Sequence, residues 1–205
     1  MRQGLTLLLM AGGLACGTGK ERVLSAHGFI GVEMPSPLVT PDLTFTDSHG
    51  QPFHLPGAMT GKVTLLMVGY THCPDVCPVH LANLAAVLKK MPTEIQSGVQ
   101  VVFVTIDPVR DTPPVLGSFV AAFDPAFIGL TGSDSSLASL QQALQLGLAY
   151  ENRAGKDGSY TVGHASAVIA CTKDGLARVR YPFGTRQADW AHDLPLLVGF
   201  AGSRK

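Results

Sequence analysis

The sequence predicts a single α/β domain with a central sheet flanked by helices. Of its 205 residues, 46% are hydrophobic and 15% are charged, which suffices for one well-buried core. Short apolar, β-branched runs alternate with segments of helical spacing along the chain. Fifteen basic residues balance fifteen acidic residues, so the net charge does not favour binding to nucleic acid or to an anionic membrane.

The first residues have the pattern of an export signal. Arg2 is followed by an apolar stretch over residues 5–15, which is too short to span a bilayer. The run Gly13-Leu14-Ala15-Cys16 resembles a bacterial lipobox, with Gly13 where a larger aliphatic residue is usual. We therefore expect a signal peptide over residues 1–16 with lipidation at Cys16, or an ordinary secretory signal with an incidental cysteine. Both place the mature protein beyond the inner membrane, with a tether over residues 17–36 and a folded domain over 37–205.

The elements of the first half follow from periodicity and turn signals. Residues 43–46 and 52–55 flank the turn Ser48-His49-Gly50 and predict a β-hairpin. An apolar run over 63–68 predicts a buried strand. A helix is predicted over 79–91, after Pro78 in its first turn. The almost wholly apolar residues 99–106 predict a strand that is covered on both faces.

The second half continues the alternation. Thr112-Pro113 starts a predicted helix that runs to residue 123, and residues 128–130 form a short strand. Another helix starts at Ser133 or Asp134 and runs to residue 146. Strands over 165–171 and 176–181 surround a turn, and a last helix covers 187–198. This order predicts a thioredoxin-like mixed sheet flanked by helices, with an N-terminal β-hairpin extension; the pattern alone leaves other doubly wound folds open.

Two cysteines lie between the predicted strand and helix, in GYTHCPDVCP at residues 69–78. The spacing of Cys73 and Cys77 places both sulfurs on one face of a helix that starts near Pro74. Free amides at a helix start stabilise thiolates and lower the cysteine pKa from about 8.5, whereas the charge of Asp75 opposes this. We predict a redox-active dithiol rather than a structural disulfide. Cys171 lies in an apolar strand and is predicted to be a buried small hydrophobe.

A third ligand would make this dithiol a metal site. Two thiolates suit Cu(I), and an added imidazole allows Cu(II) or zinc. His164 immediately precedes a predicted strand whose entry loop packs on the dithiol turn in a thioredoxin fold, so we predict it as the ligand. His72 and His80 remain alternatives. The other histidines are expected at the surface: His27, His49, His54 and His192.

The chain resembles the Sco/SenC family of copper chaperones for cytochrome c oxidase assembly. The resemblance rests on GYTHCPDVCP, on VVFVTIDPVRDTP at residues 101–113, on AAFDPAFIGLTG at residues 121–132, and on the strand that follows His164. It implies that Cys73, Cys77 and His164 bind one copper ion per monomer, as Cu(I) or also as Cu(II). It further implies that copper, or reducing equivalents, are delivered to the dinuclear copper centre of oxidase subunit II.

The resemblance also bears on location, partners and neighbouring residues. The lipobox-like run predicts a lipid-anchored protein on the periplasmic side of a bacterial envelope. There we expect it to meet another periplasmic copper carrier or thiol reductase. Asp107 and Arg110 match the family's DPxRDTP element and are expected to make loop and cap hydrogen bonds near the site, with a direct functional role as the alternative. Family members usually carry Asp where this chain has Gly163, so we expect either a more loosely oriented imidazole or one of altered basicity, with a changed copper affinity.

Three functions are compatible with such a site. The first is a metallochaperone that binds and releases copper without turnover. The second is a thiol-disulfide oxidoreductase, with Cys73 as the attacking thiolate and Cys77 as the resolving thiol. The third, a thiol peroxidase, is disfavoured by Tyr70, which stands where a peroxiredoxin requires Thr or Ser.

Overall fold

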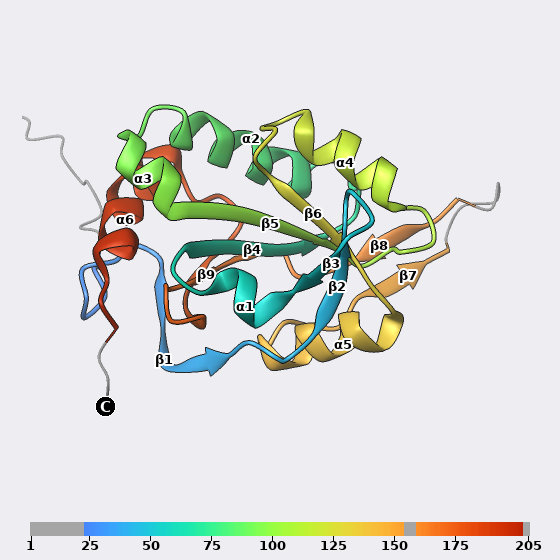
Figure 1. Cartoon of the computed structure of the whole chain (residues 1–205), viewed down its shortest axis with the longest axis horizontal. Helices are drawn as coiled ribbons and strands as arrows, with labels where there is room; N and C mark the ends of the chain where they lie inside the picture. The colour runs from blue at the N-terminus through green and yellow to red at the C-terminus, as the bar shows by residue number, and fades with distance from the viewer. Residues whose placement is uncertain (1–22, 154–158, 203–205) are drawn as a thin grey trace, which may run out of the picture.

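A mixed eight-stranded sheet forms the centre of the protein, in a computed structural model that describes residues 23–153 and 159–202 (Figure 1). Its strand order is β1-β10-β9-β4-β5-β6-β2-β3. The strands of this sheet are β1 (Val32–Val39), β2 (Thr44–Asp47), β3 (Pro52–His54), β4 (Val63–Gly69), β5 (Val99–Thr105), β6 (Ile128–Thr131), β9 (Val168–Cys171) and β10 (Leu176–Tyr181). A separate pair consists of β7 (Tyr150–Asn152) and β8 (Thr161–Gly163).

Helices cover both faces of the sheet, as Figure 1 shows. They are α1 (Leu55–Met59), α2 (Val76–Leu88), α3 (Thr93–Gly98), α4 (Pro113–Ala121), α5 (Asp134–Ala143) and α6 (Gln187–Gly199). Alternate residues of β4 point to opposite faces: Leu65 packs in the cluster with α2, α4 and α6, whereas Leu66 packs in the cluster with α1 and α5. Every residue of β4 is buried, as expected for a central strand with helices on both sides. These features confirm the predicted fold class.

Several element boundaries differ from the prediction for local reasons. Helix α2 begins at Val76, three residues early, because the Asp75 side chain accepts a hydrogen bond from the Val76 amide as N-cap. Helix α5 ends at Ala143 because Gln145 adopts a positive φ of 52° soon after it. Strand β9 begins at Val168, which leaves residues 164–167 as a loop. Helix α3 and the β7–β8 pair were not predicted.

The folded unit starts earlier than residue 37, so the prediction of a tether through residue 36 differs from the structure. Strand β1 pairs antiparallel with β10, and Phe29 is buried in the core. The buried carboxylate of Asp193 on α6 accepts hydrogen bonds from the amides of Ile30, at 3.0 Å, and Gly31, at 2.9 Å. These contacts attach the first turn to the domain. The predicted signal peptide and Cys16 lie outside the described residues.

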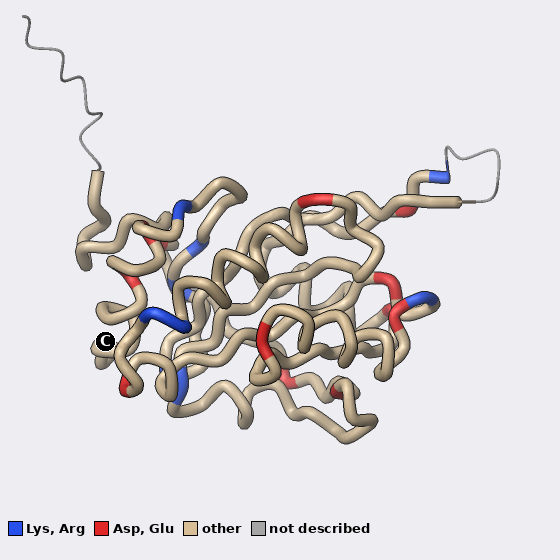
Figure 2. The backbone as a smooth tube through the Cα atoms, turned by 90° about the horizontal axis from the view of Figure 1, so that it is seen from above, with Lys and Arg blue, Asp and Glu red and all other residues tan. Residues whose placement is uncertain are grey.

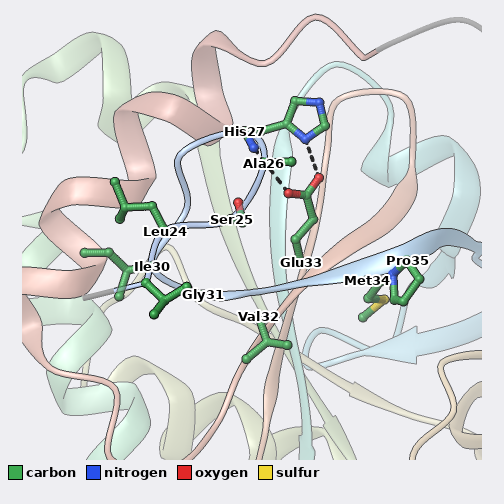
Figure 3. Close-up of a pocket in the computed structure, with 11 residues that line it drawn as sticks. Leu24, Ser25, Ala26, His27, Ile30, Gly31, Val32, Glu33, Met34 and Pro35 are labelled. Atoms are coloured by element: carbon green, nitrogen blue, oxygen red, sulfur yellow. Dashed lines mark hydrogen bonds and ion pairs between the residues drawn. The ribbon is translucent and has the colours of Figure 1, made fainter. Parts of the chain in front are cut away.

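The N-terminal turn also borders a surface pocket of about 600 Å³ (Figure 3). The His27 ring contacts the Glu33 carboxylate across this turn, which closes residues 27–33 into a compact corner. Charged residues of both signs are interspersed along the described chain (Figure 2). Within residues 23–153 and 159–202, no helix is both long and apolar enough to cross a bilayer.

Candidate metal centre

Three elements bring the predicted ligands together. Cys73 lies in the loop after β4, Cys77 lies in the first turn of α2, and His164 directly follows β8. The Nε2 atom of His164 is 3.7 Å from the Sγ atom of Cys73 and 3.7 Å from that of Cys77. The three atoms lie within 4.8 Å of one another, and no other group of three possible His, Cys, Asp or Glu ligands occurs in the described part of the chain.

The spacing of these atoms fits one metal ion. An ion bonded to sulfur at about 2.3 Å and to imidazole nitrogen at about 2.0 Å separates the two donor atoms by about 3.5 to 3.7 Å at tetrahedral to trigonal angles. The observed distances from nitrogen to both sulfurs, 3.7 Å, lie in this range. Two sulfurs and one imidazole make a soft donor set, which favours Cu(I) and also accepts Cu(II) or zinc.

The two cysteines are reduced and differ in ionisation. A hydrogen bond from the Cys77 thiol is the main reason that the pKa of Cys73 falls to about 4, against the opposing effect of burial; the Cys77 amide and the His164 ring lower it further. The same hydrogen bond, together with complete burial, raises the pKa of Cys77. The metal-free site therefore holds a thiolate at Cys73 and a thiol at Cys77.

Asp75 does not oppose the thiolate as strongly as its position in the motif suggested. Its carboxylate is engaged with the Val76 amide at the start of α2, and its own backbone amide helps to lower the pKa of Cys73. Amides at the start of a helix stabilise negative charge, so the local backbone favours ionisation of Cys73.

The imidazole of His164 has a defined orientation. Its Nδ1 atom lies 2.8 Å from the carbonyl oxygen of Ala165, which only accepts, so Nδ1 carries a proton and Nε2 is directed at the two sulfurs. The ring of Tyr70 packs edge-on against the imidazole, with centroids 5.7 Å apart. A hydrogen bond to the second nitrogen is the usual device for orienting a ligating histidine, and here a backbone carbonyl provides it. The Ala165 carbonyl therefore provides an orienting contact that Gly163 cannot provide.

Gly163 lies against the ring of Tyr150. It pairs with Tyr150 across the β7–β8 ladder, and a Cβ atom at residue 163 would lie 2.4 Å from Cζ of the Tyr150 ring. The tyrosine side chain is 68% exposed, so its ring covers this space from the solvent side. A side chain at residue 163 requires the ring of Tyr150 to move.

The other candidate histidines lie outside the group of ligand atoms. His80 is buried, and its Nε2 atom donates a hydrogen bond of 2.9 Å to the carbonyl of Ser166, so it supports the loop that carries His164; burial lowers its pKa. His72 is exposed and contacts the Thr71 hydroxyl at 3.1 Å. The four histidines expected at the surface are exposed: His27, His49, His54 and His192. Cys171 is fully buried, and burial raises its pKa, in agreement with an apolar packing role.

The sequence did not single out two residues that support the site. Asp111 is fully buried and accepts hydrogen bonds from the amide and hydroxyl of Thr71, at 2.8 Å and 2.6 Å, and from the Thr105 hydroxyl at 2.6 Å. Tyr160, just before β8, contacts Arg110 and Asp107. The only signal for Asp111 was its place in DPVRDTP, and Tyr160 lies in a segment without periodicity.

Comparisons with known proteins identify a family and several relatives of this chain. The SCO1/SenC family model matches residues 33–198. A protein of Stutzerimonas stutzeri, whose name describes copper binding, is 33% identical over 145 residues, or 71% of this chain and 70% of that protein. The mitochondrial SCO2 homolog of Mus musculus is 35% identical over 138 residues, which span 66% of this chain and 52% of the mouse protein.

Solved structures show the same fold. Copper-bound ScoI of Bradyrhizobium japonicum is 30% identical, with a TM-score of 0.67 over 79% of this chain and 98% of that chain. Apo Sco1 of Thermus thermophilus is 31% identical, with a TM-score of 0.73 over 84% and 99%. BsSco, described as a member of the Sco family of cytochrome c oxidase assembly proteins and as having a disulfide switch, is 21% identical, with a TM-score of 0.63 over 82% and 98%. The family match over most of the chain shows that this protein belongs to the SCO1/SenC family.

Proposed function

We propose that this protein is a metallochaperone that binds one copper ion per monomer through Cys73, Cys77 and His164. The observation that carries the proposal is the convergence of two sulfurs on one imidazole nitrogen, each at 3.7 Å. Support comes from copper-bound ScoI of Bradyrhizobium japonicum, which shares 30% of its residues with this chain. Copper is the expected ion because thiolate and imidazole together suit it in both valences.

The ionisation of the dithiol determines how copper is loaded. Ligation requires both sulfurs as thiolates, and only Cys73 is ionised in the metal-free protein. Copper binding at neutral pH therefore releases the Cys77 proton, about one proton per ion. Cys73 is 8% exposed and His164 is half-buried, so the ligands lie close enough to the surface for direct transfer to another protein.

We further propose that the cargo is delivered to the dinuclear copper centre of cytochrome c oxidase subunit II. This step is supported by family membership and by the description of BsSco as a member of a family of oxidase assembly proteins. The proposed location is the periplasmic side of a bacterial envelope, with a lipid anchor at Cys16. The proposed copper donor is another periplasmic carrier.

An anaerobic titration of the reduced protein with Cu(I) and Cu(II) tests copper binding. We expect one ion per monomer, and large losses of affinity in Cys73→Ser, Cys77→Ser and His164→Ala. His72→Ala is the matched control, because this exposed histidine is adjacent to Cys73 but lies outside the ligand group. Equal affinity of the parent and the three ligand variants would refute the proposal. Incubation of the loaded protein with the apo copper domain of subunit II tests delivery.

The second candidate function is a thiol-disulfide oxidoreductase, favoured by the lowered pKa of Cys73. Its thiolate would attack a disulfide sulfur of the partner and form a mixed disulfide. Cys77, after losing its proton, would then attack the Cys73 sulfur. Two electrons pass to the partner, which leaves as a dithiol, while a Cys73–Cys77 disulfide forms. His164→Ala separates the two functions, because thiol exchange should survive this change and copper binding should not.

A further inference from the structure

One loop contacts both halves of the metal centre. It follows β5 and covers residues 106–112, at the edge of the sheet where the parallel neighbour β4 also ends. The Ile106 amide donates a hydrogen bond of 2.8 Å to the carbonyl of Gly69, where the cysteine loop begins. The two loops therefore start side by side.

On the cysteine side, the contact is made by Asp111. Its buried carboxylate accepts hydrogen bonds from the amide and hydroxyl of Thr71, two residues before Cys73. The Thr105 hydroxyl holds the same carboxylate from β5 at 2.6 Å. The cysteine loop is thus attached to the end of β5 through one carboxylate.

On the histidine side, the contact is made by Arg110 and Asp107. The guanidinium of Arg110 lies 3.6 Å from the centroid of the Tyr160 ring, and its Nη1 atom donates a hydrogen bond of 3.1 Å to the Tyr160 carbonyl. The Tyr160 hydroxyl donates to Asp107 at 2.9 Å, and Asp107 also forms an ion pair with Arg110. Three interactions therefore attach Tyr160 to the loop.

Tyr160 is a sensitive point of attachment because it directly precedes the strand that leads to His164. Strand β8 begins at residue 161, and His164 comes immediately after its last residue. The β7–β8 pair has no strand neighbour in the described part of the chain, and an isolated pair of strands is marginally stable. Arg110 also lies 5.5 Å from the centroid of Tyr70, the ring that packs on His164. The position of His164 thus depends on contacts outside the β7–β8 pair.

We infer that Arg110 and Asp107 are positioning residues for the copper site, which hold His164 against the cysteines through Tyr160. The pair is largely buried, at 23% and 4% side-chain exposure, and such pairs add little net stability compared with apolar packing. Stabilising the fold is therefore a weak explanation for the pair, whereas both side chains contact Tyr160, the residue that leads into β8. This inference rests on the proposed function, because it treats His164 as a ligand.

The test compares Arg110→Gln with Arg178→Gln. The control removes a guanidinium from another ion pair, buried Arg178 with exposed Asp174 at 2.7 Å, which lies on β10 and its turn. We expect Cu(I) affinity to fall about tenfold or more in Arg110→Gln, as for other partners that orient a ligand, and to stay at the parental value in Arg178→Gln.

A double-mutant cycle separates positioning from general destabilisation. If Arg110 acts through the histidine, Arg110→Gln should not weaken copper binding further in a His164→Ala background. An additive loss, or parental affinity in Arg110→Gln, would overturn the inference. If Arg110→Gln does not fold, the partly exposed Tyr160→Leu replaces it with the same expected result. A parent that binds no copper would instead refute the proposed function.

Discussion

The ionised state of Cys73 allows a direct test of the electrostatics of the site. With a pKa of about 4, its thiol is almost fully ionised at pH 6. An ordinary cysteine with a pKa of about 8.5 is about 0.3% ionised at that pH, so the thiolate fraction differs by about 300-fold. Because the thiolate is the reactive form, the rate of alkylation at Cys73 should hardly change between pH 6 and pH 8.

The assay is alkylation of the reduced, metal-free protein by iodoacetamide at several pH values, with the modified residue identified by mass spectrometry. The pH profile is the relevant measurement, because the low exposure of Cys73 affects the absolute rate equally at every pH. Cys77 and Cys171 should remain unmodified, since both are fully buried and burial raises the pKa of each. A rate at Cys73 that rises about tenfold per pH unit from pH 6 to pH 8 would refute the reasoning.

Two variants identify the cause of the lowered pKa of Cys73. The hydrogen bond from the Cys77 side chain is the largest contribution that lowers the pKa of Cys73, and the His164 ring contributes less. The midpoint of the alkylation profile should therefore move further toward alkaline pH in Cys77→Ala than in His164→Ala. The reverse order would show that the imidazole, rather than the second thiol, stabilises the thiolate.

Three further predictions concern the surroundings of the site. Gly163→Asp should alter the unfolding free energy by less than about 1 kcal/mol, because only the exposed end of Tyr150 must move. The same variant should raise the affinity for Cu(II) relative to Cu(I) in competition titrations. Asp111→Asn should lower the unfolding free energy by about 2 to 3 kcal/mol in urea denaturation, with exposed Asp42→Asn as an unaffected control. Asp193→Asn should accelerate amide hydrogen exchange at Ile30 and Gly31, and unchanged exchange would contradict the proposed anchoring of the N-terminal turn.

The elements that the sequence predicted well have a strong hydrophobic signal. The apolar runs of β4 and β5 reflect burial on both faces of the sheet, and the apolar stripe of α2 reflects burial of one helix face. Strand β7 is exposed at all three residues, so it has no alternation to detect. Strand β1 was not predicted, because its segment is weakly patterned. Its Pro35 and Pro37 are compatible with a strand at the edge of a sheet, where the missing amides need no partner.

Some features of the candidate site could be predicted from the sequence, and others depend on the three-dimensional path of a loop. Its cysteines could be located from local spacing, and His164 from the way a thioredoxin fold brings a loop against the dithiol turn. The carbonyl of Ala165 could not be foreseen, because its direction depends on the backbone of a loop that the sequence assigned to a strand. The contact of Tyr150 with Gly163 likewise depends on the unpredicted β7–β8 register.

The asymmetry of the two cysteines suits a protein that both accepts and releases a metal ion. The two sulfurs share one proton at neutral pH, and that proton resides on the buried Cys77. A bound copper ion therefore competes with a proton for one ligand, and its affinity should fall as the pH decreases. With both sulfurs ionised in advance, the ion would be held more tightly and given up less readily. The hydrogen bond that ionises Cys73 also protonates Cys77, so one interaction prepares the site for capture and limits the stability of the complex.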